Sequence, residues 1–184
     1  MNEEKPLIVL SGQIASGKGT VAKYLRERYR GEIFRYSDIL KDILSRLGLA
    51  YTRANLASLG EALRGAFGGA VLSETLLRDI AHRRPALAVL DGLRKKDELA
   101  ALRAGARTVF VFIEAPAEVR YRRLLSRGEK KDETEKTFEQ FLADQRRPAD
   151  KEIAELRSLA DYVVRNDSSP TETFAQIDDI MEKI

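Results

Sequence analysis

Short apolar runs alternate with longer amphipathic segments along this chain, which is typical of parallel strands connected by helices. The apolar runs are continuous rather than alternating, as in strands that are buried on both faces of a sheet. They predict five strands, at residues 6–11, 32–36, 86–91, 106–113 and 161–164. Helices are predicted at residues 18–30, 38–48, 54–66, 70–83, 95–104, 116–127, 137–158 and 170–183. The pattern therefore predicts an α/β fold, a parallel sheet covered by helices on both faces.

The connection between the second and third predicted strands is unusually long. It holds three predicted helices, whereas a simple crossover between parallel strands needs only about one. We therefore expect residues 37–84 to form an inserted substrate-binding subregion within a single domain covering residues 1–184. The last helix has a clear start, because Ser169 can cap it, Pro170 suits its first turn and Glu172 completes a capping box.

The composition narrows the class of protein. A chain of 184 residues with 43% hydrophobic and 33% charged residues is ordinary for one globular domain. It contains no cysteine, which excludes disulfides and thiolate chemistry and suits a reducing compartment. The apolar stretch at residues 7–10 is too short for a membrane span or a signal peptide. We therefore expect a cytoplasmic protein that has no membrane partner.

The net charge of +3 and the pI near 9.1 leave two kinds of anionic partner open. The basic residues are interleaved with 29 acidic ones, and the aromatic residues, 7% of the chain, do not alternate with them. This pattern offers no base-stacking platform, so nucleic acid is the weaker interpretation. We expect a small anionic molecule as the partner, and a monomer or small homo-oligomer.

The strongest local signal follows the first predicted strand. An apolar run ends in a loop bounded by Gly12 and Gly17, and Lys18 closes the loop where an amphipathic helix begins. In a phosphate-binding loop, backbone N–H groups and the positive end of the helix surround a polyphosphate, and the lysine reaches the β- and γ-phosphates. The alternative is an ordinary glycine-rich turn between a strand and a helix. The nucleotide-binding residues predicted here are Gly12, Ala15, Ser16, Gly17, Lys18, Gly19 and Thr20.

The pattern Gly12-x-x-x-x-Gly17-Lys18-Gly19-Thr20 resembles the nucleoside monophosphate kinase group of P-loop proteins, which includes adenylate kinases and, more distantly, dephospho-coenzyme A kinases. In the common P-loop a Ser or Thr follows the lysine and ligates Mg²⁺, but Gly19 offers no oxygen. The resemblance therefore implies ATP as the donor and Mg²⁺ held by ATP, water and acids elsewhere. It extends from residue 7 to about residue 180, and implies a three-layer P-loop kinase fold with a five-stranded parallel sheet, a helical acceptor-binding insertion and a short lid.

Two aspartates are candidates for the metal shell, each through water. Asp91 ends a buried strand before Gly92, so its carboxylate is expected at the carboxyl edge of the sheet, where ligands bind; the alternative is a turn cap. The segment Asp91-Gly92-Leu93-Arg94 is similar to the Asp-Gly-x-x-Arg segment of adenylate kinases, with one residue fewer. That similarity implies a metal-shell role for Asp91 and binding of the acceptor phosphate by Arg94.

The segment from Tyr36 to Lys41 looks like the one after the second strand of adenylate kinases. It implies that Asp38 serves the metal or the acceptor and that Lys41 binds the acceptor phosphate; a plain helix cap is the alternative. The segment Leu59–Arg64 resembles phage deoxynucleoside monophosphate kinases and archaeal adenylate-kinase-related proteins. By that resemblance Arg64 faces the acceptor, although a helix-surface arginine is usually just solvated.

Three arginines share one face of the predicted helix at residues 116–127: Arg120, Arg123 and Arg127. Guanidinium groups in such a row favour an anion, and they can stabilise the charge that develops during phosphoryl transfer. In the resembling kinases this region is a lid, expected here at about residues 126–137. We expect Lys18, Asp91, Arg123 and Arg127 to be catalytic, with Arg146 and Arg147 as possible additions; surface ion pairs are the alternative. The loop that contains Asn166 resembles the one that lies against the adenine.

Three reactions compete at this point. A phosphate acceptor, such as a nucleoside monophosphate, needs no general base, so positioning and positive charge suffice. A hydroxyl acceptor, as in dephospho-coenzyme A kinase, benefits from a carboxylate base that Asp38 could supply. An NTPase switch or an RNA-associated ATPase would keep Lys18 without basic residues around an acceptor. The inventory of residues favours the first.

Overall fold

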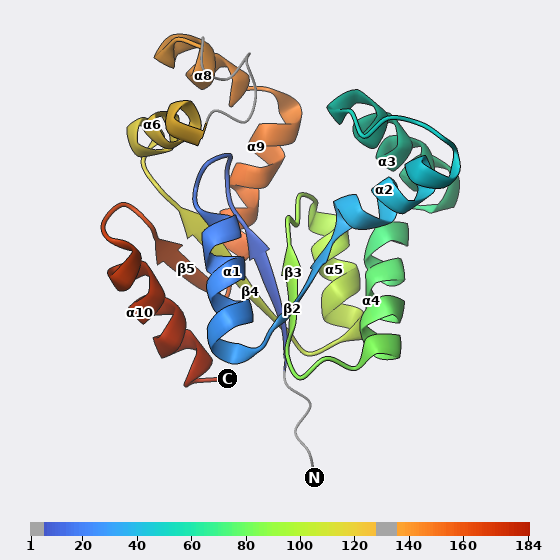
Figure 1. Cartoon of the computed structure of the whole chain (residues 1–184), viewed down its shortest axis with the longest axis horizontal. Helices are drawn as coiled ribbons and strands as arrows, with labels where there is room; N and C mark the ends of the chain where they lie inside the picture. The colour runs from blue at the N-terminus through green and yellow to red at the C-terminus, as the bar shows by residue number, and fades with distance from the viewer. Residues whose placement is uncertain (1–5, 128–135) are drawn as a thin grey trace.

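Five parallel strands form the central sheet in the order β2-β3-β1-β4-β5 (Figure 1). The computed structural model describes residues 6–127 and 136–184, apart from the side chains of Arg53, Arg127 and Ala149. The prediction of five strands is confirmed. The three inner strands are buried along their apolar runs, and the two edge strands are only partly buried. Their bounds are β1 (Leu7–Ser11), β2 (Glu32–Arg35), β3 (Ala88–Asp91), β4 (Thr108–Glu114) and β5 (Tyr162–Arg165).

The central strand β1 contributes to a hydrophobic core on each face of the sheet. Leu7 and Val9 belong to one core and Ile8 and Leu10 to the other, because successive side chains of a strand point to opposite faces. One face is covered by α1 (Lys18–Tyr29) and α10 (Pro170–Met181). The other is covered by α2 (Tyr36–Arg46), α4 (Val71–Arg83), α5 (Lys96–Gly105), α9 (Pro148–Glu155) and the 3₁₀ helix η1 (Leu156–Leu159).

The single helix predicted at residues 137–158 is wrong. The structure has α8 (Phe138–Asp144), a break, and then α9 and η1. Pro148 is the first residue of α9, where its missing N–H costs nothing, and it disfavours a helical conformation for the residue before it. The predicted capping box of α10 is confirmed, with the Ser169 hydroxyl accepting from the Glu172 amide.

The connections place two groups of helices around the carboxyl ends of the strands. In Figure 1, α2 and α3 (Arg53–Phe67) lie on one side of the loop between β1 and α1, whereas α6 (Ala117–Arg127) and α8 lie on the other side. The loop at residues 12–17 therefore lies between the two groups, at the sheet edge where α/β proteins bind ligands. No helix in the described part of the chain is long and apolar enough to span a membrane.

Candidate functional site

The loop between β1 and α1 has the backbone shape of a phosphate cradle. Three of its residues have positive φ angles: Gly12 at 147°, Ala15 at 58° and Gly17 at 98°. A Cβ at Gly12 would overlap the Ile113 carbonyl oxygen, and one at Gly17 would overlap the Asn166 amide, so both positions require glycine. A non-glycine residue with positive φ is uncommon, and at Ala15 it helps to turn the loop on itself.

Lys18 lies at the first position of α1, as the motif predicts. Its Nζ donates to the carbonyl oxygens of Gly12 at 2.6 Å and Gln13 at 3.3 Å, so the ammonium group is held over the loop. The Ser16 hydroxyl is buried and has no hydrogen-bond partner in the described part of the chain. Gly19 and Thr20 follow on the exposed side of the first helical turn. The residues predicted to bind nucleotide are thus brought together on one loop and helix terminus.

Arg123 of α6 reaches the phosphate-binding loop from the lid side. Its Nη2 donates to Asn166 Oδ1 at 3.3 Å, and its Nη1 lies 3.9 Å from the position of a Cβ on Gly17. Nη1 is buried, and among the described residues it has no hydrogen-bond partner. An unpartnered buried guanidinium nitrogen is costly, and an anion on the loop would satisfy it. A cavity of about 180 Å³, lined also by Thr20 and Phe174, borders the same atoms.

Arg120 does not extend the predicted row of anion-binding arginines. Its side chain is only 4% exposed, and its Nε donates to the Ala115 carbonyl at 3.0 Å, while the guanidinium lies 5.5 Å from the Phe141 ring centroid. The same group also donates to the side chain of Gln145, directly after α8, and burial lowers the pKa of Arg120. Its role is to join α6 to α8 because the aliphatic stem and the charged plane are both enclosed by protein.

The remaining arginines predicted on the lid side are less closely placed. Arg127 ends α6, but its side chain lies outside the described residues, as does most of the predicted lid at residues 126–137. Arg146 and Arg147 are exposed in the turn between α8 and α9, where Arg147 pairs with Asp144 at 2.6 Å. In the described part of the chain, two of the predicted α6 arginines therefore lie at the loop. Arg123 lies beside Gly17 and contacts Asn166, and Arg120 Nη1 donates to the Ile14 carbonyl oxygen at 3.5 Å.

Asp91 is the last residue of β3 and lies at the carboxyl edge of the sheet, as the sequence predicts. Its side chain is 14% exposed, and Arg35 at the end of β2 donates to its Oδ2 at 3.2 Å. β3 pairs with β1 in a register that puts Leu10 opposite Asp91, so the carboxylate is one strand away from the phosphate-binding loop. Arg94 follows on the surface and is exposed.

Asp38 and Lys41 form an ion pair with each other on the exposed side of α2, with Nζ and Oδ1 3.3 Å apart. Both side chains are about half exposed, at 51% and 46%. No side-chain cap hydrogen bond is present at the start of α2, so the capping role considered for Asp38 is not found. The pair lies in the first two turns of α2, which follows Arg35 at the end of β2.

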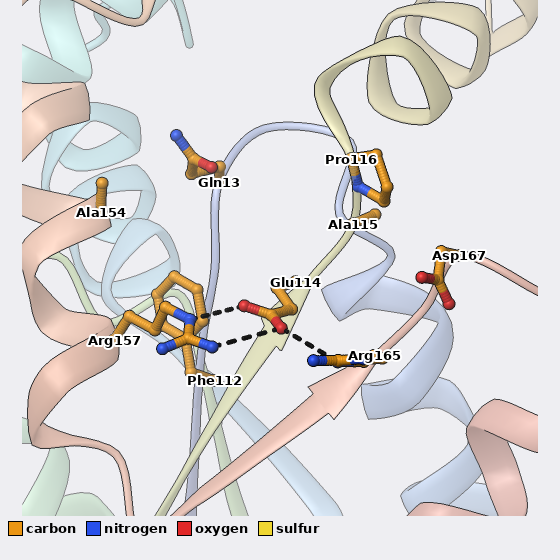
Figure 2. A pocket seen from close by; sticks show the side chains of 9 residues that line it. All are labelled: Gln13, Phe112, Glu114, Ala115, Pro116, Ala154, Arg157, Arg165 and Asp167. Atoms are coloured by element: carbon orange, nitrogen blue, oxygen red, sulfur yellow. Dashed lines mark hydrogen bonds and ion pairs between the residues drawn. The ribbon is translucent and has the colours of Figure 1, made fainter.

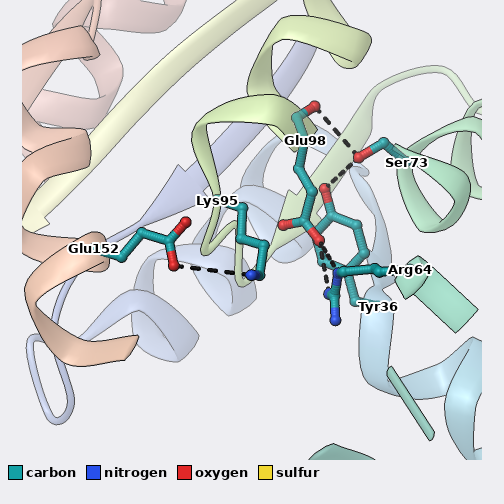
Figure 3. A network of polar contacts seen from close by, with 6 residues as sticks. All are labelled: Tyr36, Arg64, Ser73, Lys95, Glu98 and Glu152. Atoms are coloured by element: carbon teal, nitrogen blue, oxygen red, sulfur yellow. Dashed lines mark hydrogen bonds and ion pairs between the residues drawn. The ribbon is translucent and has the colours of Figure 1, made fainter. Parts of the chain in front are cut away.

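Arg64 of α3 points toward α5 instead of open solvent, as Figure 3 shows. Its Nε and Nη2 both donate to Glu98 Oε1, at 3.1 and 2.7 Å, and the Arg64 side chain is 19% exposed. Tyr36 lies in the same group; burial, followed by the charge of Glu98, raises the pKa of its hydroxyl well above the usual range. The surface alternative considered for Arg64 is therefore wrong, because the residue is part of a buried network.

The described residues offer little direct protein coordination for Mg²⁺. They contain no group of three or more His, Cys, Asp or Glu side chains placed to hold a metal ion. Asp91 is engaged by Arg35, and Asp38 by Lys41, so each fits contact through water better than direct ligation. This donor set fits a metal carried by the phosphates of a nucleotide.

A second cavity, of about 360 Å³, lies between the ends of β4 and β5 and the α9–η1 segment (Figure 2). Glu114 lies between Arg157, whose Nε donates to it at 2.6 Å, and Arg165, 3.6 Å away. The hydrogen bond from Arg157 holds the pKa of Glu114 below its usual range. The charges in this cavity are largely paired with each other, and Gln13 alone connects its lining to the phosphate-binding loop. The paired charges leave little positive charge here for an anion.

The chain matches a known family. The family model described as an AAA domain matches residues 8–145. A UPF0200 protein from Pyrococcus horikoshii is 31% identical to it, over 97% of this chain and 97% of that protein. The chain belongs to the AAA domain family and to the UPF0200 proteins.

The fold of this UPF0200 protein is that of solved P-loop kinases. Shikimate kinase from Aquifex aeolicus superposes with a TM-score of 0.57 and 21% identity, covering 96% of each chain. A gluconokinase from Sinorhizobium meliloti gives a TM-score of 0.58 and 18% identity, covering 98% of this chain and 95% of that one. These similarities concern the fold alone, and they confirm the predicted P-loop kinase sheet.

Sequence reasoning missed three residues of this UPF0200 site: Arg35, Glu98 and Gln145. Each acts on a predicted residue through a long-range contact, Arg35 on Asp91, Glu98 on Arg64 and Gln145 on Arg120. Arg35 alone left a usable signal, because it ends the second strand and so shares a sheet edge with Asp91. Glu98 lies in a helix and Gln145 in the turn after one, and the partners of both lie in other elements of the fold.

Proposed function

We propose that this UPF0200 protein is an ATP-dependent phosphotransferase. It moves the γ-phosphate of ATP to a small phosphorylated acceptor, a nucleoside monophosphate or deoxynucleoside monophosphate such as AMP. The observation that carries the proposal is Arg123 Nη1, which is buried next to Gly17 and has no hydrogen-bond partner in the part of the chain that the structure describes. A positive group in that position suits charge that develops on a transferring phosphoryl group, which is the main catalytic requirement of this chemistry.

The donor half of the proposed site consists of the loop at residues 12–17 and Lys18. Backbone N–H groups of the loop and the first turn of α1 would surround the phosphates of ATP, and Lys18 would reach its β- and γ-phosphates. Mg²⁺ would travel with ATP and neutralise its charge, with Asp91 and Asp38 in contact through water. The loop at Asn166 would lie against the adenine by its backbone, because its side chain is engaged elsewhere.

The acceptor half is formed by α2, α3 and the end of β3. Lys41, Arg64 and Arg94 supply positive charge on this side, with Asp38 beside Lys41. A phosphate acceptor is already ionised at neutral pH, so it requires positioning rather than a general base. Nothing in this arrangement needs a nucleic acid or a membrane as partner, and we propose a cytoplasmic enzyme acting on small molecules.

A hydroxyl-directed kinase, such as a dephospho-coenzyme A kinase, is the second candidate. The observation that favours it is the pairing of the acceptor-side cations, because Arg35, Lys41 and Arg64 each contact a carboxylate. Pairing lowers the positive charge available to a dianionic acceptor. A hydroxyl acceptor would use a carboxylate base, which Asp38 could supply.

The test is ADP formation from ATP in the presence of a panel of acceptors: AMP, CMP, UMP, GMP, their deoxy forms and dephospho-coenzyme A. The proposal predicts strong stimulation by at least one monophosphate and little turnover without an acceptor. Stimulation by dephospho-coenzyme A alone would establish the second candidate instead. Full turnover with no acceptor would contradict both and point to an NTPase switch or an RNA-associated ATPase.

A further inference from the structure

Glu98 is a buried carboxylate in the first turn of α5. Its side chain has no exposed surface, and the positive end of the helix favours a negative charge at this position. Oε1 receives both hydrogen bonds from Arg64. Oε2 is buried and has no hydrogen-bond partner among the described residues. One oxygen of the carboxylate therefore carries the entire contact with Arg64.

The backbone of Glu98 is fixed by the helices of the acceptor side. Ser73 of α4 donates to the Glu98 carbonyl oxygen at 3.3 Å, and its hydroxyl also shares a hydrogen bond of 3.0 Å with the Tyr36 hydroxyl (Figure 3). Tyr36 begins α2 directly after β2. Because α5 begins soon after Asp91, this network connects the end of β3 with α2, α3 and α4.

The contact also fixes which edge of Arg64 stays free. Nε and Nη2 face Glu98, whereas Nη1 lies over Gly60, where an added Cβ would come within 2.9 Å of it. Nη1 donates to no group in the described part of the chain. A guanidinium plane that is held along one edge presents its other edge in a fixed direction, which suits recognition of a phosphate or carboxylate.

We propose that Glu98 is a positioning residue for the acceptor. It aims the free edge of Arg64 at an anionic group of that molecule, and this inference rests on the proposed phosphotransfer function. Glu98 itself is fully buried, so it acts through Arg64 rather than by touching the acceptor.

Stability alone explains this arrangement poorly. Enclosing a carboxylate with one unpartnered oxygen is costly, and replacing buried ion pairs by neutral groups is often neutral or stabilising. The ion pair does fix the orientation of Arg64, which a neutral pair would not do. The donor groups of an arginine that is already held lose less entropy when they bind an anion.

The experiment measures AMP binding by calorimetry in the full-length protein and in E98Q, R64M and the double variant. Glu98→Gln keeps the shape and an acceptor oxygen but removes the charge that holds Arg64. We expect E98Q to weaken AMP binding about tenfold and leave ATP binding within about twofold. In the R64M background, E98Q should have no further effect on AMP binding, because its route to the acceptor is gone.

The matched control is E155Q, which removes the same charge from an exposed ion pair of α9 with Lys96. It should bind AMP and ATP as the unchanged protein does. A second readout is the ¹⁵N resonance of the Arg64 Nε–H, which should exchange slowly with water in the unchanged protein and rapidly in E98Q. A merely structural role for Glu98 would lower the melting temperature and leave the AMP affinity of the folded protein unaltered.

The outcomes separate the two proposals. Normal AMP affinity in E98Q, or an additive loss of affinity in the double variant, would overturn the positioning role of Glu98. The proposed acceptor site would still stand in that case, provided that the unchanged protein binds AMP. Failure of the unchanged protein to bind AMP at millimolar concentration would count against the proposed monophosphate acceptor itself. A loss in E98Q that R64M masks supports the inference.

Discussion

The Asn166 side-chain amide donates to the Ser16 carbonyl oxygen at 2.8 Å, and this contact joins the loop after β5 to the phosphate-binding loop. The other end of the amide, Oδ1, accepts from Thr173 at 3.0 Å and from Arg123 at 3.3 Å. Asn166 is only 7% exposed. The Asn166 side chain therefore holds together the phosphate-binding loop, α6 and α10. Contact between the backbone at Asn166 and the adenine stays a prediction.

Replacing Asn166 by alanine should reduce both stability and ATP affinity. The change leaves the Ser16 carbonyl and the Thr173 hydroxyl without their buried partner, which costs about 1–3 kcal/mol of unfolding free energy. Urea unfolding measures the cost and calorimetry the ATP affinity. The control is N55A, which removes an exposed amide that donates to the Ala50 carbonyl at 2.8 Å and should cost much less. Equal losses of unfolding free energy in the two variants would show that the buried Asn166 contact stabilises the protein no more than the exposed Asn55 contact does.

Replacing Arg123 by methionine should lower kcat with any active acceptor by about a hundredfold, because one aimed positive group is lost from the transition state. Methionine keeps the length of the stem, so the fold should tolerate the change. R122M, at the neighbouring exposed position on α6, is the control and should keep its activity. Steady-state kinetics separate kcat from KM, and an undiminished kcat in R123M would remove Arg123 from the catalytic group.

The contact between α1 and α10 should make stability depend on alkaline pH. Tyr29 donates to Asp178 at 2.7 Å, and burial, followed by this carboxylate, raises the pKa of Tyr29 to about 12. The folded state holds that proton more tightly than the unfolded state, whose tyrosine pKa is near 10. The stabilisation is therefore complete below about pH 10 and is lost as the pH rises toward about 12.

The check is the melting temperature of Y29F against the unchanged protein from about pH 7 to pH 12. Their difference should be constant up to about pH 10 and should then shrink. Tyr24, which also donates to Asp178, provides a comparison through Y24F. A difference in melting temperature that grows above about pH 10 would contradict the raised pKa of Tyr29.

The same contact should also matter at acid pH. The hydrogen bonds from Tyr29 and Tyr24 keep the pKa of Asp178 below its usual range, so the stabilisation from the Asp178 carboxylate is lost as the pH falls.

The strands and the phosphate-binding loop were predictable because their signals are local. Continuous apolar runs mark the buried inner strands, and the glycines at 12 and 17 lie where the backbone takes positive φ and another chain segment approaches closely. The capping box at Ser169 is equally local. The positions of Lys18 and Asp91 are predictable for the same reason. The loop motif places Lys18 at the start of a helix, and the apolar run before Asp91 places it at the end of a strand.

The rest of the site depends on contacts between distant segments. Arg64 meets Glu98 across 34 positions, and nothing in the sequence around either residue shows the pairing. Arg120 and Arg123 look equivalent on one helix face, yet the first lies against Phe141 and donates to backbone carbonyls, whereas the second keeps a buried nitrogen with no hydrogen-bond partner among the described residues. The single helix predicted at residues 137–158 is interrupted for a local reason, because Pro148 disfavours a helical conformation for the residue before it and begins a new helix instead.

Transfer of labelled phosphate tests the account most directly. The unchanged protein, K18A and K23A are incubated with γ-labelled ATP, Mg²⁺ and the monophosphate panel, and the products are separated by chromatography. Lys23 is an exposed residue of α1 that pairs with Glu27, so K23A controls for loss of a lysine near the loop. We predict label in a nucleoside diphosphate with the unchanged protein and K23A, and a loss of about a thousandfold in K18A with an unchanged melting temperature. Label found only in free phosphate, or full transfer by K18A, would contradict the account.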